Sequence, residues 1–158
     1  MAETGRIRVA KDKAELVKAL TSADGGTGPF QTFADVIVFA AALGAKHKKR
    51  VPLGEISKRE PAPIGQEHFL SKGYDLVIKL LAIVEVKEIS LLSPNDEKYE
   101  NQCLRIFEEY ANGGLEILQT ELRGAVDYSE RLLLIMMNER FNKNLPEETD
   151  FDLSKFIY

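Results

Sequence analysis

The sequence contains a single cysteine and only two histidines among its 158 residues. Cys103 cannot build a disulfide framework within the chain, which favours a reducing compartment. It shares a helical stripe with aromatic and aliphatic residues, so we expect a buried cysteine rather than a nucleophile. His47 and His68 come with no cysteine pair and no His-x-x-x-His spacing, so we expect surface positions and predict no metal site.

Catalytic motifs and long apolar runs are also missing. There is no Gly-x-Ser-x-Gly elbow and no Gly-Lys-Ser/Thr phosphate loop, and the glycines at 25, 26 and 28 are typical of a turn. No apolar run reaches the roughly 18 residues of a membrane span, and the N-terminus lacks the layout of a signal peptide. We therefore expect a cytoplasmic protein that is not an enzyme, binds no cofactor and contacts no membrane.

Charge is distributed unevenly along the chain. Residues 1–93 contain 14 Lys/Arg and 11 Asp/Glu, whereas residues 94–158 contain 7 and 14. This asymmetry allows the first half to face a polyanion, although small domains also divide their charge unevenly by chance. The adjacent acids Glu108 and Glu109 would point apart on a helix, and we expect them on a solvated surface.

Helix starts are the clearest local signal. Each has a capping residue followed three positions later by an acid, a spacing that satisfies free backbone amides and complements the helix dipole. The four pairs are Asp12 with Glu15, Thr32 with Asp35, Ser93 with Asp96, and Asp127 with Glu130.

Hydrophobic periodicity predicts a mainly α fold. We expect a compact bundle of about five or six helices that leaves room for one short N-terminal strand. The expected elements are a strand at 6–10, helices at about 12–22, 32–47, 66–87, 94–112, 114–123 and 128–142, and a surface loop at 48–65. Residues 1–144 are predicted to form a single domain, followed by an acidic, partly ordered tail over 145–158.

Three of these elements carry more specific expectations. The helix at 32–47 is apolar nearly all round, which places it in the core. The helix at 66–87 should have one apolar face that includes Phe69, Leu80 and Val84. The helix at 94–112 should end at the Asn112-Gly113 pair, because such residues commonly terminate helices.

Two basic groups are candidate nucleic-acid contacts. One follows the second helix and contains Lys46, Lys48, Lys49 and Arg50. Its cations could meet phosphates or simply complement the helix dipole. The other group is Arg6, Arg8 and Lys11, on a strand followed by two helices. That order is typical of ribbon-helix-helix DNA-binding dimers, although the glycine-rich connection and the apolar second helix depart from the pattern.

The tail mixes acids with aromatic side chains. Phe151, Phe156 and Tyr158 are candidate anchors for a protein partner, because aromatic residues favour interfaces. The same residues could instead fold back on the core of the chain, and the sequence does not choose between these alternatives.

Three segments of the chain carry a family resemblance. They are Arg-Ile-Arg-Val-Ala-Lys-Asp-Lys at 6–13, Gly-Pro-Phe-Gln-Thr-Phe-Ala-Asp-Val-Ile-Val-Phe-Ala-Ala-Ala-Leu-Gly at 28–44, and Ile-Phe-Glu-Glu-Tyr-Ala-Asn-Gly-Gly-Leu-Glu-Ile-Leu at 106–118. The chain resembles small proteins associated with the bacterial Dnd system, encoded beside the genes for DNA phosphorothioation, over most of residues 6–135. The acidic tail lies outside the likeness.

The resemblance implies a place in a modification or restriction arm of a defence system, and it supplies no active site. Our leading hypothesis is a non-enzymatic accessory protein that acts through the other proteins of that system, through duplex DNA, or through both. The apolar second helix and the aromatic tail favour protein contact. The alternative is a ribbon-helix-helix-like DNA-binding regulator that uses the basic residues of the first half, and it predicts a homodimer.

Overall fold

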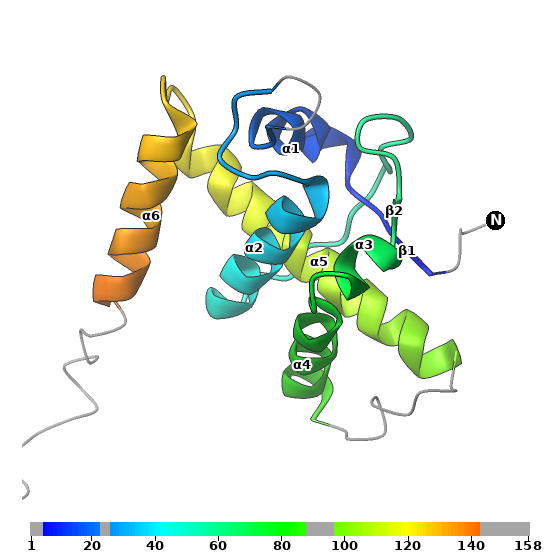
Figure 1. Ribbon diagram of the computed structural model, residues 1–158. Coiled ribbons are helices and arrows are strands. Elements are labelled where there is room, and N and C mark those ends of the chain that lie inside the picture. Colours follow the sequence, from blue (N-terminus) through cyan, green and yellow to red (C-terminus); the bar gives the residue numbers. More distant parts are fainter. Residues whose placement is uncertain (1–4, 23–25, 88–96, 143–158) are drawn as a thin grey trace, which may run out of the picture. The chain divides into compact units, whose positions relative to one another are not determined.

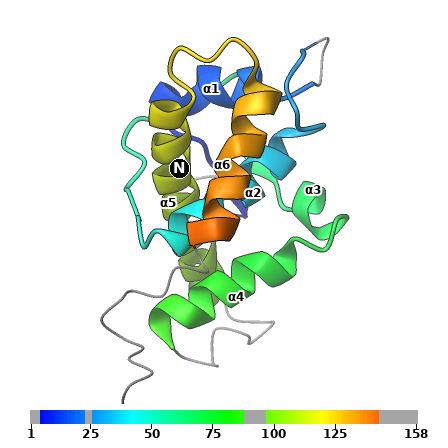
Figure 2. The same ribbon diagram turned by 90° about the vertical axis from the view of Figure 1, so that its left-hand side faces the viewer.

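The computed structural model describes residues 5–22, 26–87 and 97–142 (Figures 1 and 2). The fold is mainly helical, as predicted. Its elements are β1 (Arg6–Ile7), a 3-10 turn (Lys11–Lys13), α1 (Ala14–Ala19), α2 (Phe33–Lys46), β2 (Ile64–Gly65), α3 (Glu67–Leu70), α4 (Asp75–Val86), α5 (Glu97–Glu121) and α6 (Tyr128–Asn142). The chain divides into two compact units, Met1–Thr120 and Glu121–Tyr158.

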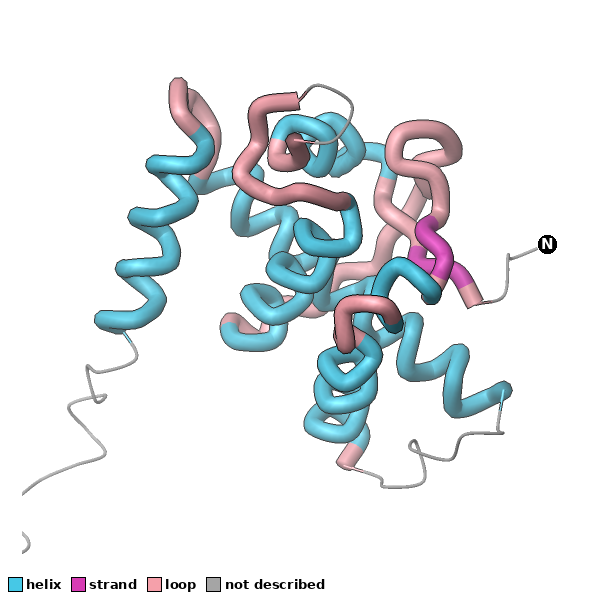
Figure 3. The backbone as a smooth tube through the Cα atoms, viewed as in Figure 1, coloured by secondary structure: helices cyan, strands magenta, loops and turns pink. Residues whose placement is uncertain are grey.

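The predicted N-terminal strand forms, but it is shorter than expected and it has a partner. Arg6 pairs with Gly65 and Ile7 with Ile64 in an antiparallel ladder (Figure 3). Ile7 is fully buried while Arg6 is exposed, as the period-two pattern predicted. The partner strand β2 lies in the segment predicted to be only a loop, because two residues are too few to give a periodic signal.

Helix α2 is a core element, as predicted. Thr32 and Asp35 form a complete capping box, in which the Asp35 N–H donates to Thr32 Oγ1 at 3.3 Å and the Thr32 N–H donates to the Asp35 carboxylate at 3.2 Å. Val36, Ile37 and Ala40 are each at most 1% exposed. The apolar side chains of this helix therefore pack in the core. None of its large apolar side chains is exposed for contact with a partner.

The predicted helix end at Asn112-Gly113 is wrong, because α5 continues to Glu121. The two glycines allow close packing instead. A Cβ on Gly114 would lie 1.7 Å from the carbonyl oxygen of Ala40, and one on Gly113 would lie 2.0 Å from that of Lys49. Side chains are excluded where α2 and the segment after it cross α5, so glycine is required there for contact and not for termination.

The single helix predicted over 66–87 is also wrong, because a turn at 71–74 divides it into α3 and α4. Gly73 has a positive φ of 75°, which favours glycine. The break changes which face of α4 meets the core. Ile78 and Ala82 are buried, whereas Leu80 and Val84, which were expected to share a face with buried Phe69, are exposed.

Of the three other predicted helix starts, one is confirmed, one is wrong and one lies outside the described residues. The bounds of α6 agree with the prediction, and the Glu130 N–H donates to the Asp127 carboxylate at 3.2 Å. The cap predicted at Asp12 is wrong, because α1 begins at Ala14 after a 3-10 turn without a side-chain cap. The Ser93 start lies outside the described residues.

Candidate interaction surfaces

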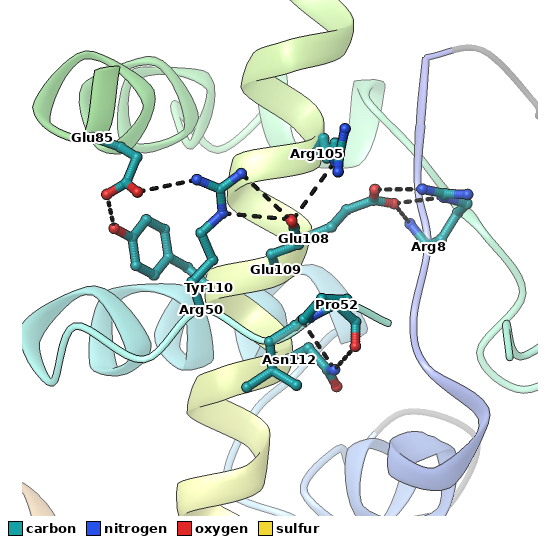
Figure 4. A network of polar contacts seen from close by, with 10 residues as sticks. Arg8, Arg50, Pro52, Glu85, Arg105, Glu108, Glu109, Tyr110 and Asn112 are labelled. Carbon is teal, nitrogen blue, oxygen red and sulfur yellow. Dashed lines mark hydrogen bonds and ion pairs between the residues drawn. The ribbon is translucent and has the colours of Figure 1, made fainter. Parts of the chain in front are cut away.

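Two acidic residues in the middle of α5 organise a polar network (Figure 4). Glu108 and Glu109 point apart, as predicted, but they are only 4% and 6% exposed, so their expected placement on a solvated surface is wrong. A buried carboxylate needs a cationic or hydrogen-bonding partner. Each of these two has its own arginine from a distant part of the chain.

Arg8 is the partner of Glu108. Its backbone N–H donates to Oε2 at 2.6 Å, its Nε to the same oxygen at 3.0 Å and its Nη2 to Oε1 at 3.0 Å. The hydrogen bond to Glu108 raises the pKa of Arg8 above its ordinary value. This predicted DNA contact therefore ties the segment after β1 to α5.

Arg50 joins three elements. Its Nη1 donates to Glu85 of α4 at 3.0 Å and its Nε lies 3.4 Å from Oε2 of Glu109. The Nε of Arg105 approaches the other oxygen of Glu109, Oε1, at 3.7 Å. The Tyr110 hydroxyl donates to Glu85. Burial and this hydrogen bond raise the pKa of Tyr110 to about 12, while the same bond lowers the pKa of Glu85.

The segment after α2 crosses α5 beside this network. Asn112 Nδ2 donates to the carbonyls of Val51 at 3.2 Å and Pro52 at 3.1 Å, and the Val51 N–H donates to the Glu109 carbonyl at 3.0 Å. These bonds satisfy backbone groups of a segment that has no ladder of its own. They also fix the position of Arg50 against the exposed beginning of α5.

The other predicted DNA contacts are dispersed. Lys11 pairs with Glu55 at 3.1 Å and Lys49 with Glu116 at 3.6 Å, while Arg6, Lys46 and Lys48 are exposed. Figure 4 shows Arg8 and Arg50 on two sides of α5, so the structure does not join the two basic groups there. The aromatic anchors predicted in the tail, Phe151, Phe156 and Tyr158, lie outside the described residues.

An exposed apolar surface runs along α4. Leu76, Leu80 and Val84, which we call the α4 stripe, are 69%, 59% and 63% exposed. Spaced four residues apart, they share one face of the helix. The charged residues of α4 are Asp75, Lys79 and Glu85. Lys79 and Glu85 are exposed, and Glu85 is bonded to Arg50 and Tyr110. Sequence reasoning missed this surface because it placed Leu80 and Val84 on one apolar face with Phe69 and did not single out Leu76.

Helix α6 carries a comparable feature. Leu133, Met137 and Phe141, the α6 stripe, are 58%, 45% and 60% exposed and are again four residues apart. Leu134 and Met136 flank them and are also exposed. A surface helix usually carries polar residues on its exposed side, whereas this exposed side of α6 carries apolar ones.

Two of the hollows in the first unit are lined by residues that the structure describes. One, of about 420 Å³, lies between Arg50 and the start of α5 and is lined by Arg50, Lys98, Asn101, Gln102, Arg105 and Ile106. The other, of about 890 Å³, has walls of mixed charge. Two of its lysines form ion pairs with acids of the same hollow. Lys11 pairs with Glu55 and Lys18 with Glu60, both at 3.1 Å.

The residues considered for nucleophilic or metal chemistry are placed as expected. Cys103 is buried, and burial raises the pKa of its thiol. His47 and His68 are exposed. Over 5–22, 26–87 and 97–142, no three His, Cys, Asp or Glu side chains gather as a metal site, and no helix in those ranges is long and apolar enough to cross a membrane.

Comparison with known proteins places the chain in a family. No curated protein and no solved structure shows a significant match to it. A family model described as DNA sulphur modification system-associated protein 4 matches residues 6–156. The match extends beyond the resemblance seen in the sequence and takes in most of the acidic tail. The chain therefore belongs to the family of DNA sulphur modification system-associated protein 4.

Proposed function

We propose that this protein is a non-enzymatic, cytoplasmic accessory protein that binds other proteins of the DNA sulphur modification system through the α4 stripe. The observation that carries the proposal is the exposure of Leu76, Leu80 and Val84, at 69%, 59% and 63%. Single exposed leucines are ordinary, but a continuous row along a helix marks an interaction surface.

The energetics of the stripe favour docking. Full burial of one leucine or valine side chain is worth about 1.5–3 kcal/mol, so three adjacent ones can form the centre of an interface surrounded by weaker contacts. The helix also needs no rearrangement, because its opposite face is already fixed by buried Ile78 and Ala82. A preformed surface loses little conformational entropy when it binds.

Charge indicates the character of the partner surface. Lys79 and Lys87 are exposed cations of this region, whereas the exposed acid Glu85 is already bonded to Arg50 and Tyr110. Complementary potentials favour encounter. A partner helix or groove with an apolar centre and acidic margins fits this face. The α6 stripe supplies a second apolar surface, and its methionine can adapt to partners of different shape.

The experiment is co-purification of the tagged protein from cells that express the other proteins of the system. Leu76→Asp with Leu80→Asp should remove most of the recovered partner. Val126→Asp is the matched control, because Val126 is fully exposed and outside the stripe. Unchanged recovery with the double variant would overturn the proposal, and a dimer lost only in that variant would assign the stripe to a second copy of this chain.

The ribbon-helix-helix alternative gains no support from the geometry. β1 pairs with β2 of its own chain, whereas the ribbon of such a dimer requires a strand from each copy. Of its expected contacts, Arg8, Lys11, Lys49 and Arg50 are all held in ion pairs with acids of the same chain.

A further inference from the structure

We infer that α6 packs antiparallel against α6 of a second copy of this chain, with the α6 stripe at the centre of a homodimer interface. The inference goes beyond docking at the α4 stripe, because it involves other residues and another partner. Helix α6 belongs to the second compact unit and α4 to the first.

Helix α6 carries apolar side chains on two opposite faces. One face is packed, since Leu132 and Ile135 are only 5% and 7% exposed. The other face carries the α6 stripe with Leu134 and Met136 beside it, and these five side chains are between 45% and 60% exposed. At 3.6 residues per turn, the stripe lies on the side of the helix away from Leu132 and Ile135. The second face is therefore apolar without being covered by the described part of the chain.

The exposed face is suited to contact with another helix. Large apolar side chains at a four-residue spacing form the ridge that fits into the grooves of a neighbouring helix. Methionine and aromatic residues are enriched at interfaces between proteins, and this face contains Met136, Met137 and Phe141. A contiguous apolar patch of several side chains marks an interaction site on a protein surface.

The sequence of α6 is nearly symmetric about Ile135. Glu130 lies five residues before it and Arg140 five residues after it, while Leu133 and Met137 lie two residues before and after it. Two such helices can pack antiparallel about a two-fold axis at the level of Ile135. Glu130 of each copy then faces Arg140 of the other, and Leu133 faces Met137, so every contact forms twice.

Charge complementarity favours this arrangement. Glu130 and Arg140 lie on the side of α6 that carries the stripe, and both are exposed. Within 5–22, 26–87 and 97–142, neither forms an ion pair. A parallel pair would bring Glu130 against Glu130 and Arg140 against Arg140, whereas the antiparallel pair brings opposite charges together. The helix is thus complementary to itself, which makes a second copy the partner that fits it.

The expected interface is small. Specific interfaces bury about 800 Å² from each partner, which is more than the exposed face of one helix of this length supplies. We therefore expect a dimer that dissociates at micromolar concentration. Its presence has to be measured over a range of protein concentrations.

The test is sedimentation equilibrium of the whole protein across the micromolar range. The natural chain should show a monomer–dimer equilibrium. Leu133→Asp with Met137→Asp should raise the dissociation constant by about a hundredfold or more, because four carboxylates would enter an apolar interface. Leu76→Asp with Leu80→Asp on the α4 stripe is the matched control, since it adds the same charge at two exposed leucines. It should leave the dissociation constant unchanged.

Reversal of single charges tests the antiparallel register. Glu130→Arg alone and Arg140→Glu alone should each raise the dissociation constant about tenfold, because symmetry places two repulsive pairs in every dimer. An equimolar mixture of the two variants should regain the affinity of the natural chain, since both pairs across the mixed dimer again join opposite charges. Both substitutions lie at exposed positions, so they test the interface without a buried change.

Four results would overturn the inference. They are a natural chain that stays monomeric at the highest concentration, a dimer that survives Leu133→Asp with Met137→Asp, an equal loss of dimer in the α4 variant, and single charge reversals without effect. A chain that is monomeric and loses a co-purified protein of the system only in the α6 variant would assign the stripe to that protein instead. Unfolding curves measured by circular dichroism exclude misfolding as the cause of a loss.

Discussion

Helices α2 and α4 are both strongly apolar, yet they serve different purposes. α2 contains Asp35 and Lys46 as its only charged residues, and its apolar side chains are buried or half-buried apart from the small Ala42. α4 has three charged residues, buries Ile78 and Ala82, and leaves the α4 stripe in solvent. The difference lies in what covers each helix and not in its composition.

The contact between α2 and α5 explains why one helix is covered. Gly44 and Gly114 remove side chains where the two backbones meet, so α2 fits closely against α5. The arrangement of α4 is different. It is held through Glu85, which bonds to Arg50 and Tyr110, and among the described residues its other face has no such neighbour. An apolar helix therefore indicates either core or interface, and contacts decide which.

The largest effect should come from placing a charge on the covered face of α4. Ile78→Asp should destabilise the fold by about 4 kcal/mol or more, because an unpaired carboxylate would be buried. Leu80→Asp, on the opposite face, should change stability by less than about 1 kcal/mol. Chemical denaturation monitored by circular dichroism measures both. Equal losses would show that the two faces do not differ as described.

The next effect concerns the contact of α2 with α5. Gly114→Ala would ordinarily stabilise a helix interior by up to about 1 kcal/mol. Here the added Cβ would lie 1.7 Å from the Ala40 carbonyl oxygen, so we expect a loss of about 3 kcal/mol. Thr120→Ala in the exposed last turn of α5 serves as the control. A gain in stability for Gly114→Ala in the same denaturation assay would contradict the close packing.

A smaller loss should follow removal of one arginine. Arg8→Ala leaves the buried carboxylate of Glu108 without its ion-pair partner. Breaking a buried pair costs about 3–5 kcal/mol, and the partial exposure of Arg8 reduces our expectation to about 2 kcal/mol. Arg59→Ala, at an exposed site, should be nearly neutral in the same assay. If the two variants were equally stable, Glu108 would be solvated and not buried.

The smallest expected effect is a loss of folding stability at low pH. Burial alone would raise the pKa of Asp35, but hydrogen bonds from Lys72, Tyr74 and Thr32 lower it below its ordinary value of 3.8. A lowered pKa in the folded state means that this stabilisation is present above pH 3.8 and is lost as the pH falls through the folded pKa.

The effect can be isolated by thermal melts at pH 6 and near pH 3. Asp35 connects the first turn of α2 to the turn before α4 through Lys72 and Tyr74. Asp35→Asn should therefore remove roughly 2–4 °C of the acid-induced fall in Tm. An unchanged fall would assign the acid sensitivity to other carboxylates, of which Glu85 is the first candidate because its pKa is also lowered.

The local fold could largely be predicted from the sequence. The capping box at Thr32 and the start of α6 depend on residues close together in the chain, and both formed as expected. The errors arose where distant residues decide the outcome. The Asn112-Gly113 pair indicates a helix end by itself, and only the close approach of Lys49 to Gly113 and of Ala40 to Gly114 shows why the glycines are there.

The interaction surfaces were less accessible to prediction for the same reason. The α4 stripe depends on the turn at Gly73 and on which face α5 covers. The burial of Glu108 and Glu109 depends on arginines about 100 and 59 residues away in sequence. Arg50 likewise lies beside the beginning of α5 only because the fold brings these distant segments together.

The most direct test of docking at the α4 stripe is site-specific photo-crosslinking in cells that contain the DNA sulphur modification system. A photoreactive amino acid at Leu80 should give a crosslinked product with another protein of the system, identified by mass spectrometry. The same probe at exposed Val126 should give none. Crosslinking at Val126 but not at Leu80, or no product at Leu80 from a folded protein, would contradict the assignment of this surface.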